Sequence, residues 1–462
     1  MKDTIFITNQ TGYRLYEKYA KDLPVIDYHC HLPPNEIVED KPFSDIGEMW
    51  MAADHYKWRL MRANGVPEEY VTGGKNYREK FLKFAEIMPL CIGNPVYHWA
   101  HIELRKYFGI RDALSAKTAE SIYERANEII RKEKYSPRKL IEMSRVEFIA
   151  TTDDPKDSLV YHEQLAADKS FHTQVTPTFR PDKMADLWTK DYPDYIKGLG
   201  NTAGVQISSF EDFLQAVEQR LFDFRAHGCK IADHGMSELP NVLGDFEQAK
   251  AAFEKVLAGG TADAGERAQF MSYLMLVLGK QYVKYDMAMQ VHTAVIRNQN
   301  SRIFEQLGPD SGIDSVGEVI PANIIGRLLD WLDQNDALPK TILYTLNPSN
   351  YYVMATMGGN FQGGTAGKIQ LGSAWWFCDH KRGIEEQLNI VAETGALGQF
   401  IGMLTDSRSF SSYGRHDYFR RILCNLIGTW MDKGEIPDDD EYVKGLIEGV
   451  CYYNAKHYFG IV

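Results

Sequence analysis

The chain has 462 residues, of which 44% are hydrophobic and 25% charged, as expected for a globular protein with a large core. Its net charge of −12 argues against a nucleic-acid partner, and no apolar run reaches the ~18 residues that a membrane span requires. The six cysteines form no CxxC pair and the N-terminus has no secretory-signal pattern, so we expect reduced thiols in a cytoplasmic protein.

Eight short β-rich segments alternate with longer stretches of helical periodicity. This alternation indicates parallel βαβ units, and eight of them are typical of an α/β fold with a TIM-like (β/α)8 barrel. The predicted strands are Val25–Tyr28, Val146–Thr151, Gln174–Phe179, Lys230–Ala232, Ala288–His292, Thr341–Thr345, Lys368–Gly372 and Phe400–Leu404.

The first predicted strand runs directly into two histidines, His29 and His31. Residues two apart on a strand face the same side, so both imidazoles should lie together at the carboxyl end of the strand. Parallel barrels build their active sites at that end. Two neutral imidazoles side by side can bind a divalent metal ion, although an HxH motif alone is a weak signal.

Residues 33–145 separate the first two predicted strands and are too many for a single crossover helix. We therefore expect a helical insertion after the first strand, with helices at Tyr77–Met88, Tyr97–Tyr107 and Ala116–Lys134. The predicted division of the chain is 1–32 for the N-terminal segment and first strand, 33–145 for the insertion subdomain, and 146–462 for the rest of the barrel, with a closing helix at Asp440–Phe459.

Polar side chains follow almost every predicted strand. One such residue is routine loop chemistry, but a polar group after each strand in turn fits a catalytic rim. In strand order these residues are His29 and His31, Asp153, Arg180, Asp233 and His234, His292, Asn347, Ser373, and Asp406 and Arg408. The pair Asp233 and His234 could be a second metal-binding pair, but we interpret these residues as structural or as supporting the residues that line the site.

The histidine pair on the first strand, His292 on a middle strand and Asp406 on the last strand together resemble the amidohydrolase superfamily of metal-dependent barrels. Binuclear members of that superfamily carry a bridging carbamate on a lysine at the end of the fourth strand. This chain has Lys230 at the start of that strand instead. The resemblance therefore implies a mononuclear site.

Five runs narrow the resemblance to the uronate isomerase (glucuronate isomerase) family, because they occur in that family's order and at compatible spacings. The runs are Asp27–Leu32, Asp54–Arg59, Thr178–Asp182, Gly372–Phe377 and Thr405–Phe410. The resemblance covers essentially the whole chain. It implies an aldose–ketose isomerase of hexuronate catabolism that interconverts D-glucuronate with D-fructuronate and D-galacturonate with D-tagaturonate.

The same resemblance implies which residues form the site. The metal ligands would be His29, His31 and Asp406, and we expect one divalent ion, zinc. The substrate would be surrounded by Tyr56, Arg180, His292 and Arg408. The expected partner is a small uronate, with no nucleic acid and no membrane, and we expect a homo-oligomer.

The reaction itself needs a base for the C2 proton and an electrophile for the oxygens of the enediol. Asp406 can be the base, while His292 or Tyr56 can give a hydrogen bond or a proton to the oxygens. A metal can polarise the C1 carbonyl. A metal-assisted hydride shift is an alternative route that the sequence leaves open.

The C6 carboxylate of a uronate suits arginine, whose planar fork binds carboxylates with two parallel hydrogen bonds. Arg180 and Arg408 are the candidates, and the alternative for Arg180 is a structural ion pair with Asp182. Trp375 and Trp376 could stack on the apolar face of the sugar or could simply pack in the core.

Two other functions compete with the isomerase. The first is a mononuclear metal-dependent hydrolase of the same superfamily, acting on an ester, lactone or amide. The arginine pair without a bridging lysine favours the isomerase over that hydrolase. The second is a non-catalytic sugar-acid-binding protein, which would have no use for the histidines and aspartates at the strand ends.

Overall fold

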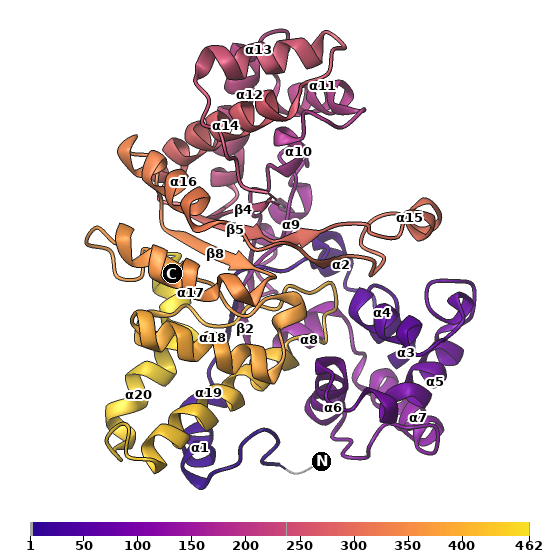
Figure 1. Cartoon of the computed structure of the whole chain (residues 1–462). Coiled ribbons are helices and arrows are strands. Elements are labelled where there is room, and N and C mark those ends of the chain that lie inside the picture. The colour runs from indigo at the N-terminus through magenta and orange to yellow at the C-terminus, as the bar shows by residue number, and fades with distance from the viewer. Residues whose placement is uncertain (1–2, 237, 462) are drawn as a thin grey trace.

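The computed structural model describes residues 3–236 and 238–461, so Met1, Lys2, Ser237 and Val462, which fall in the predicted first and last parts of the chain, lie outside the described residues. Two parallel sheets form its centre (Figure 1). One has the order β1 (Val25–Asp27), β2 (Val146–Ala150), β3 (Gln174–Thr176). The other has the order β4 (Ile231–Met236), β5 (Ala288–Thr293), β8 (Thr341–Thr345), β9 (Ile369–Leu371).

Phe179 joins the two sheets. It makes isolated parallel bridges to Asp153 on one side and to Ala232 on the other. Its backbone N–H donates to the carbonyl of Ile231 over 3.0 Å, and its carbonyl accepts from the N–H of Asp233 over 2.9 Å. The predicted strands from the first to the seventh thus lie side by side in chain order, each near its predicted position.

The eighth predicted strand, Phe400–Leu404, is wrong: residues 401–407 form no strand. The physical reason is a left-handed backbone at Gly402 (φ +78°), where an added Cβ would lie 2.0 Å from the carbonyl oxygen of Val450. The segment nevertheless lies beside the first strand. The Asp406 N–H donates to the His29 carbonyl over 3.2 Å, and the His31 N–H donates to the Ser407 carbonyl over 2.9 Å.

Seven α-helices lie between β1 and β2 and agree with the predicted helical insertion. They are α2 (Pro34–Glu39), α3 (Ile46–Met51), α4 (His55–Ala63), α5 (Tyr77–Ile87), α6 (Pro95–Phe108), α7 (Ala119–Glu133) and α8 (Pro137–Met143). Figure 1 shows α3 to α7 gathered on one side, away from the helical lobe formed by residues 192–226 and 246–284. The division into 1–32, 33–145 and 146–462 as separate units stays a prediction.

The remaining helices surround the sheets. They are α1 (Gln10–Leu15), α9 (Val160–Ala167), α10 (Asp182–Ala185), α11 (Tyr192–Ala203), α12 (Phe210–Ala226), α13 (Phe246–Leu257), α14 (Ala264–Lys284), α15 (Ser301–Leu307), α16 (Ala322–Gln334), α17 (Tyr351–Gly358), α18 (Lys381–Thr394), α19 (Gly414–Asp432), α20 (Asp440–Glu448) and α21 (Asn454–Tyr458). Every residue of β5 and β8 is buried, as in parallel sheets covered on both faces. None of the described helices is long and apolar enough to cross a membrane.

Two features concern the ends of the strands. The segment predicted as a closing helix forms α20, a π-helical turn over 449–453, and α21. Phe459 follows α21 and packs on Tyr28 with ring centroids 5.0 Å apart. A short antiparallel pair, β6 (Val295–Ile296) with β7 (Ser315–Val316), was not predicted. It carries α15 on an excursion that leaves the carboxyl end of β5 (Figure 1).

Candidate functional site

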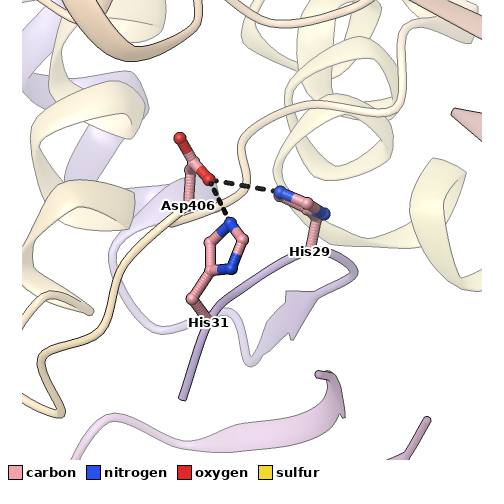
Figure 2. Close-up of side chains that lie close together, drawn as sticks. All are labelled: His29, His31 and Asp406. Carbon is pink, nitrogen blue, oxygen red and sulfur yellow. Dashed lines mark hydrogen bonds and ion pairs between the residues drawn. The ribbon is translucent and has the colours of Figure 1, made fainter. Parts of the chain in front are cut away.

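His29, His31 and Asp406 form a compact cluster directly beyond the carboxyl end of β1 (Figure 2). Asp406 Oδ1 lies 3.2 Å from Nε2 of His29 and also 3.2 Å from Nε2 of His31. The backbone of Asp406 is left-handed (φ 45°), which turns its carboxylate toward the histidines. The predicted pairing of the HxH motif with this aspartate is therefore present.

This cluster has the donor set of a metal site. Its two imidazole nitrogens and one carboxylate oxygen lie within 4.8 Å of one another. Burial lowers the pKa of His31 to about 4, which leaves a free lone pair on a neutral ring. Burial opposes the charged form of Asp406 as well, but both histidines outweigh it and hold the Asp406 pKa well below its usual value. The residues present could hold a metal ion.

Asp233 is the centre of a second buried network. Its Oδ1 accepts from Nδ1 of His292 over 2.6 Å, and its Oδ2 accepts from Nη1 of Arg180 over 2.9 Å. Nδ1 of His29 lies 3.7 Å from the same Oδ2. The group of His29, Asp233 and His292 could also surround a metal ion. His234, by contrast, faces away toward the hydroxyl of Tyr282, 3.1 Å distant.

The network fixes the tautomer of His292. Burial lowers its pKa despite the nearby Asp233 carboxylate, so the ring is neutral. Because an ionised carboxylate only accepts hydrogen bonds, the shared proton lies on Nδ1. Nε2 is then a lone-pair acceptor, and it is buried with no hydrogen-bond partner among the described residues.

Both candidate arginines lie at the site, and each already pairs with a carboxylate. Arg180 donates from Nε to Asp182 over 2.8 Å, so the ion pair considered as the alternative is present in addition to the bond to Asp233. Arg408 donates from Nη2 to Asp310 over 2.8 Å. Asp310 is half exposed, whereas Asp233 is fully buried, so the Arg408 pair is the more easily exchanged.

The two tryptophans, Trp375 and Trp376, make different contacts. Trp375 donates its indole N–H to Oδ2 of Asp406 over 2.8 Å, and its ring centroid lies 4.6 Å from that of His292. Trp376 stacks on Phe377 and packs under the guanidinium of Arg297, 5.2 Å from its ring centroid. Trp375 thus holds the second oxygen of the carboxylate whose first oxygen faces the histidines.

Tyr56 lies beside the site rather than on its wall. Its ring stacks on His55 and lies under the guanidinium of Arg415, 4.8 Å from that group. Its hydroxyl is buried and lacks a hydrogen-bond partner within the described part of the chain.

A cavity of about 280 Å³ brings these groups together. The predicted residues that line it are His29, His31, Arg180, His292, Trp375, Trp376, Asp406 and Arg408. The other lining residues, to which the sequence analysis assigned no specific role, are His55, Thr152, Arg297 and Asp310. His55 lies within the run Asp54–Arg59, which carries part of the family resemblance, so the sequence contained a signal for this residue. Arg297 and Asp310 come from the unpredicted excursion after β5, so no strand-end pattern marks them.

Comparison with known proteins agrees with this geometry. A family model described as glucuronate isomerase matches residues 1–459. The uronate isomerase of Caldanaerobacter subterraneus subsp. tengcongensis is 49% identical over 462 residues, covering 100% of this chain and 99% of that protein. The uronate isomerase of Bacillus licheniformis is 46% identical, covering 99% and 97% of the two chains.

Solved structures give the same result. The crystal structure of uronate isomerase from Thermotoga maritima superposes with a TM-score of 0.93 at 33% identity and covers 99% of each chain. Glucuronate isomerase from Caulobacter crescentus, at 24% identity, shares the fold with a TM-score of 0.92 over 100% of this chain and 97% of that one. Together with the parallel sheets, these neighbours confirm the predicted α/β, TIM-like fold, although the eighth position holds no strand.

Proposed function

This chain belongs to the glucuronate isomerase family, and from that premise we propose that its cavity interconverts D-glucuronate with D-fructuronate and D-galacturonate with D-tagaturonate. The enzyme is a uronate isomerase, that is, an aldose–ketose isomerase. One observation carries the mechanism: the Asp406 carboxylate is held by Trp375 through one oxygen and faces two imidazoles through the other.

The proposed base is Asp406. Its low pKa keeps it ionised at neutral pH, in the form that can accept the C2 proton and return it to C1. The N–H of Trp375 fixes the direction of the carboxylate without removing its charge. Transfer through an enediol then needs partners for the two substrate oxygens, and the cavity offers them nearby.

His292 is the proposed partner of a substrate hydroxyl. Its free Nε2 can accept the proton of the C2 hydroxyl and return it to the C1 oxygen, while Asp233 stabilises the imidazolium that forms in between. Tyr56 is the proposed source of a further hydrogen bond, because its hydroxyl has no other partner among the described residues. This role requires the side chain to reach the cavity on substrate binding.

We propose one divalent ion, zinc, on His29, His31 and Asp406. When bound, such an ion supplies a Lewis acid for the substrate carbonyl oxygen. The protein's own contribution is the arrangement of ligands: the neutral ring of His31, the ionised Asp406, and a second carboxylate, Asp233, beyond the far nitrogen of His29.

The C6 carboxylate of the substrate is proposed to bind Arg408 by displacing Asp310, whose side chain reaches solvent. Arg180 keeps its ion pairs with buried Asp233 and partly exposed Asp182. It therefore contributes positive charge to the site rather than a free guanidinium for two parallel hydrogen bonds. Trp375 and Trp376 are proposed to border the sugar.

The direct test of the proposed function is incubation of the pure protein with D-glucuronate and detection of the ketose by NMR. Hydrolysis of an ester, lactone or amide with no ketose would favour the hydrolase instead.

We also propose a cytoplasmic enzyme that assembles as a homo-oligomer. The six cysteines are all free and buried, which suits a reducing compartment. Light scattering of the purified protein measures the assembly, and a monomeric mass at micromolar concentration would contradict it.

A further inference from the structure

A second cavity, also of about 280 Å³, lies at the opposite end of β1 from the histidine cluster. Val25, the first residue of β1, lines it, whereas His29 follows the last residue of that strand. Six basic side chains line this cavity, namely Lys21, Arg105, Lys106, Arg145, Arg420 and Arg421. Among the described residues, only two carboxylates do so, those of Asp22 and Asp417. In a chain of net charge −12, this local excess of positive charge calls for an explanation.

Two of these cations have no carboxylate partner among the described residues. Arg420 is 5% exposed, and its guanidinium donates only to the backbone carbonyls of Leu23, Pro24 and Cys451. Lys106 is exposed and forms no ion pair with any described side chain. A buried guanidinium without a counter-charge is costly, so an anion in this cavity would be stabilised.

Two neutral polar groups point to the same conclusion. His416 is 4% exposed and lines the cavity, and its Nε2 has no hydrogen-bond partner in the part of the chain described. Burial, Arg420 and Lys106 hold the pKa of His416 well below its usual value. The hydroxyl of Tyr413, also on the wall, is likewise buried without a described partner. Both groups can donate a hydrogen bond to an oxyanion.

We propose that this cavity binds a small dianion of the phosphate class, with Lys106, Arg420 and His416 around the phosphoryl oxygens. Arginine and lysine are the usual phosphate ligands, the first through its fork and the second as a point charge. The cavity is separate from the histidine cluster and from the three arginines that line the catalytic cavity, and the proposal does not depend on the proposed reaction.

Occupancy would link α6, which carries Lys106, to α19, which carries His416 and Arg420. The loop that carries Asp406 leads into α19. A bound dianion that cross-links the two helices is expected to stabilise the folded chain in proportion to its saturation.

The test is a titration of the full chain with inorganic phosphate and, separately, with ribose 5-phosphate, followed by calorimetry and thermal unfolding at low ionic strength. We expect saturable binding and a raised Tm. If the phosphomonoester binds more tightly than phosphate, the ligand is a phosphorylated metabolite; equal affinities indicate free phosphate. No binding of either at about 10 mM would overturn the proposal, since that corresponds to negligible affinity.

Lys106→Met locates the bound anion, because the exposed ammonium can be removed without disturbing the core. It should weaken phosphate binding about tenfold, the loss of one charge-assisted hydrogen bond. Lys132→Met on α7 is the matched control and should leave binding unchanged. An unaltered affinity in Lys106→Met would place the anion elsewhere and refute the site. The Tm of each variant without ligand verifies that it is folded.

Discussion

Asp233 accepts the Nδ1–H of His292 over 2.6 Å from the neighbouring strand, and this bond sets which nitrogen of His292 faces the cavity. The two residues are offset by two positions in the register of β4 and β5, since Gly235 rather than Asp233 pairs with His292. The second oxygen of Asp233 is taken by Arg180. Asp233 therefore orders two predicted site residues, which is the supporting role that the sequence left open beside a structural one.

Asp233→Asn tests this relationship. Asparagine keeps the shape, but its amide can donate to Nδ1 and so move the imidazole proton to Nε2. We expect kcat to fall by about 10²–10⁴, as for the loss of a correctly oriented general base. Asp182→Asn is the matched control, because it removes a carboxylate from Arg180 without touching His292. Equal losses in both variants would show that Arg180, and not the tautomer of His292, carries the effect.

The strands and site residues that were predicted from the sequence are those that depend on short-range patterns. The HxH spacing after an apolar run gave His29 and His31, and alternation gave seven of the eight predicted strands. The link from Asp233 to His292 could not be predicted, because it depends on the register between two strands. Arg297 and Asp310 lie on an excursion with no periodicity. The eighth strand failed at Gly402, where close backbone contact outweighs strand propensity.

Asp406→Asn should keep the fold and most of the substrate affinity but lose turnover. Asparagine cannot take a proton at neutral pH, and general base catalysis alone is worth about 10²–10⁴-fold. Metal content must be measured in the same variant, because a ligand is lost too. With substrate deuterated at C2, washout of deuterium into solvent indicates proton transfer, and retention indicates a hydride shift. Near-normal turnover would move the base to His292 or Tyr56.

Substitution of Arg408 should weaken the binding of D-glucuronate, whereas substitution of Asp310 should strengthen it. Arg408→Met removes the partner of the substrate carboxylate, and kcat/KM for D-glucuronate should fall by the equivalent of ~2–5 kcal/mol. Asp310→Asn removes the internal carboxylate that competes for the same guanidinium, so KM should fall. The neutral sugar D-glucose should be a very poor substrate of the parent. Comparable turnover of glucose and glucuronate would contradict carboxylate recognition.

The metal prediction concerns stoichiometry. Protein purified without chelators should contain up to about one equivalent of zinc by elemental analysis, bound by two imidazoles and a carboxylate. The double variant His29→Ala/His31→Ala should lose it, whereas His234→Ala, whose ring faces Tyr282, should retain it. Unchanged metal content in the double variant would refute this ligand set.

Stability should fall as pH rises through the titration of Asp153, a buried carboxyl away from the histidine cluster. Burial raises its pKa to about 7, although the Thr151 hydroxyl and the Thr178 N–H, both donating to Oδ2, act in the other direction. In the unfolded chain an aspartate titrates near pH 3.9. The folded protein therefore holds a proton that the unfolded chain has released, so the contribution present below about pH 4 is lost as pH rises toward about 7.

Asp153→Asn cannot titrate and keeps an oxygen for both donors, so its free energy of unfolding should depend less steeply on pH. One proton accounts for at most ~1.4 kcal/mol per pH unit. Urea unfolding from about pH 5 to about pH 8 measures the difference between variant and parent. Burial also raises the pKa of Asp379 to about 7. The titration of Asp379 contributes equally to the free energies of unfolding of variant and parent, so it cancels in their difference. The exposed Glu163→Gln on α9 is the control. Parallel curves for Asp153→Asn and the parent would mean that Asp153 is ionised in the folded protein, with its charge stabilised by the surrounding donors.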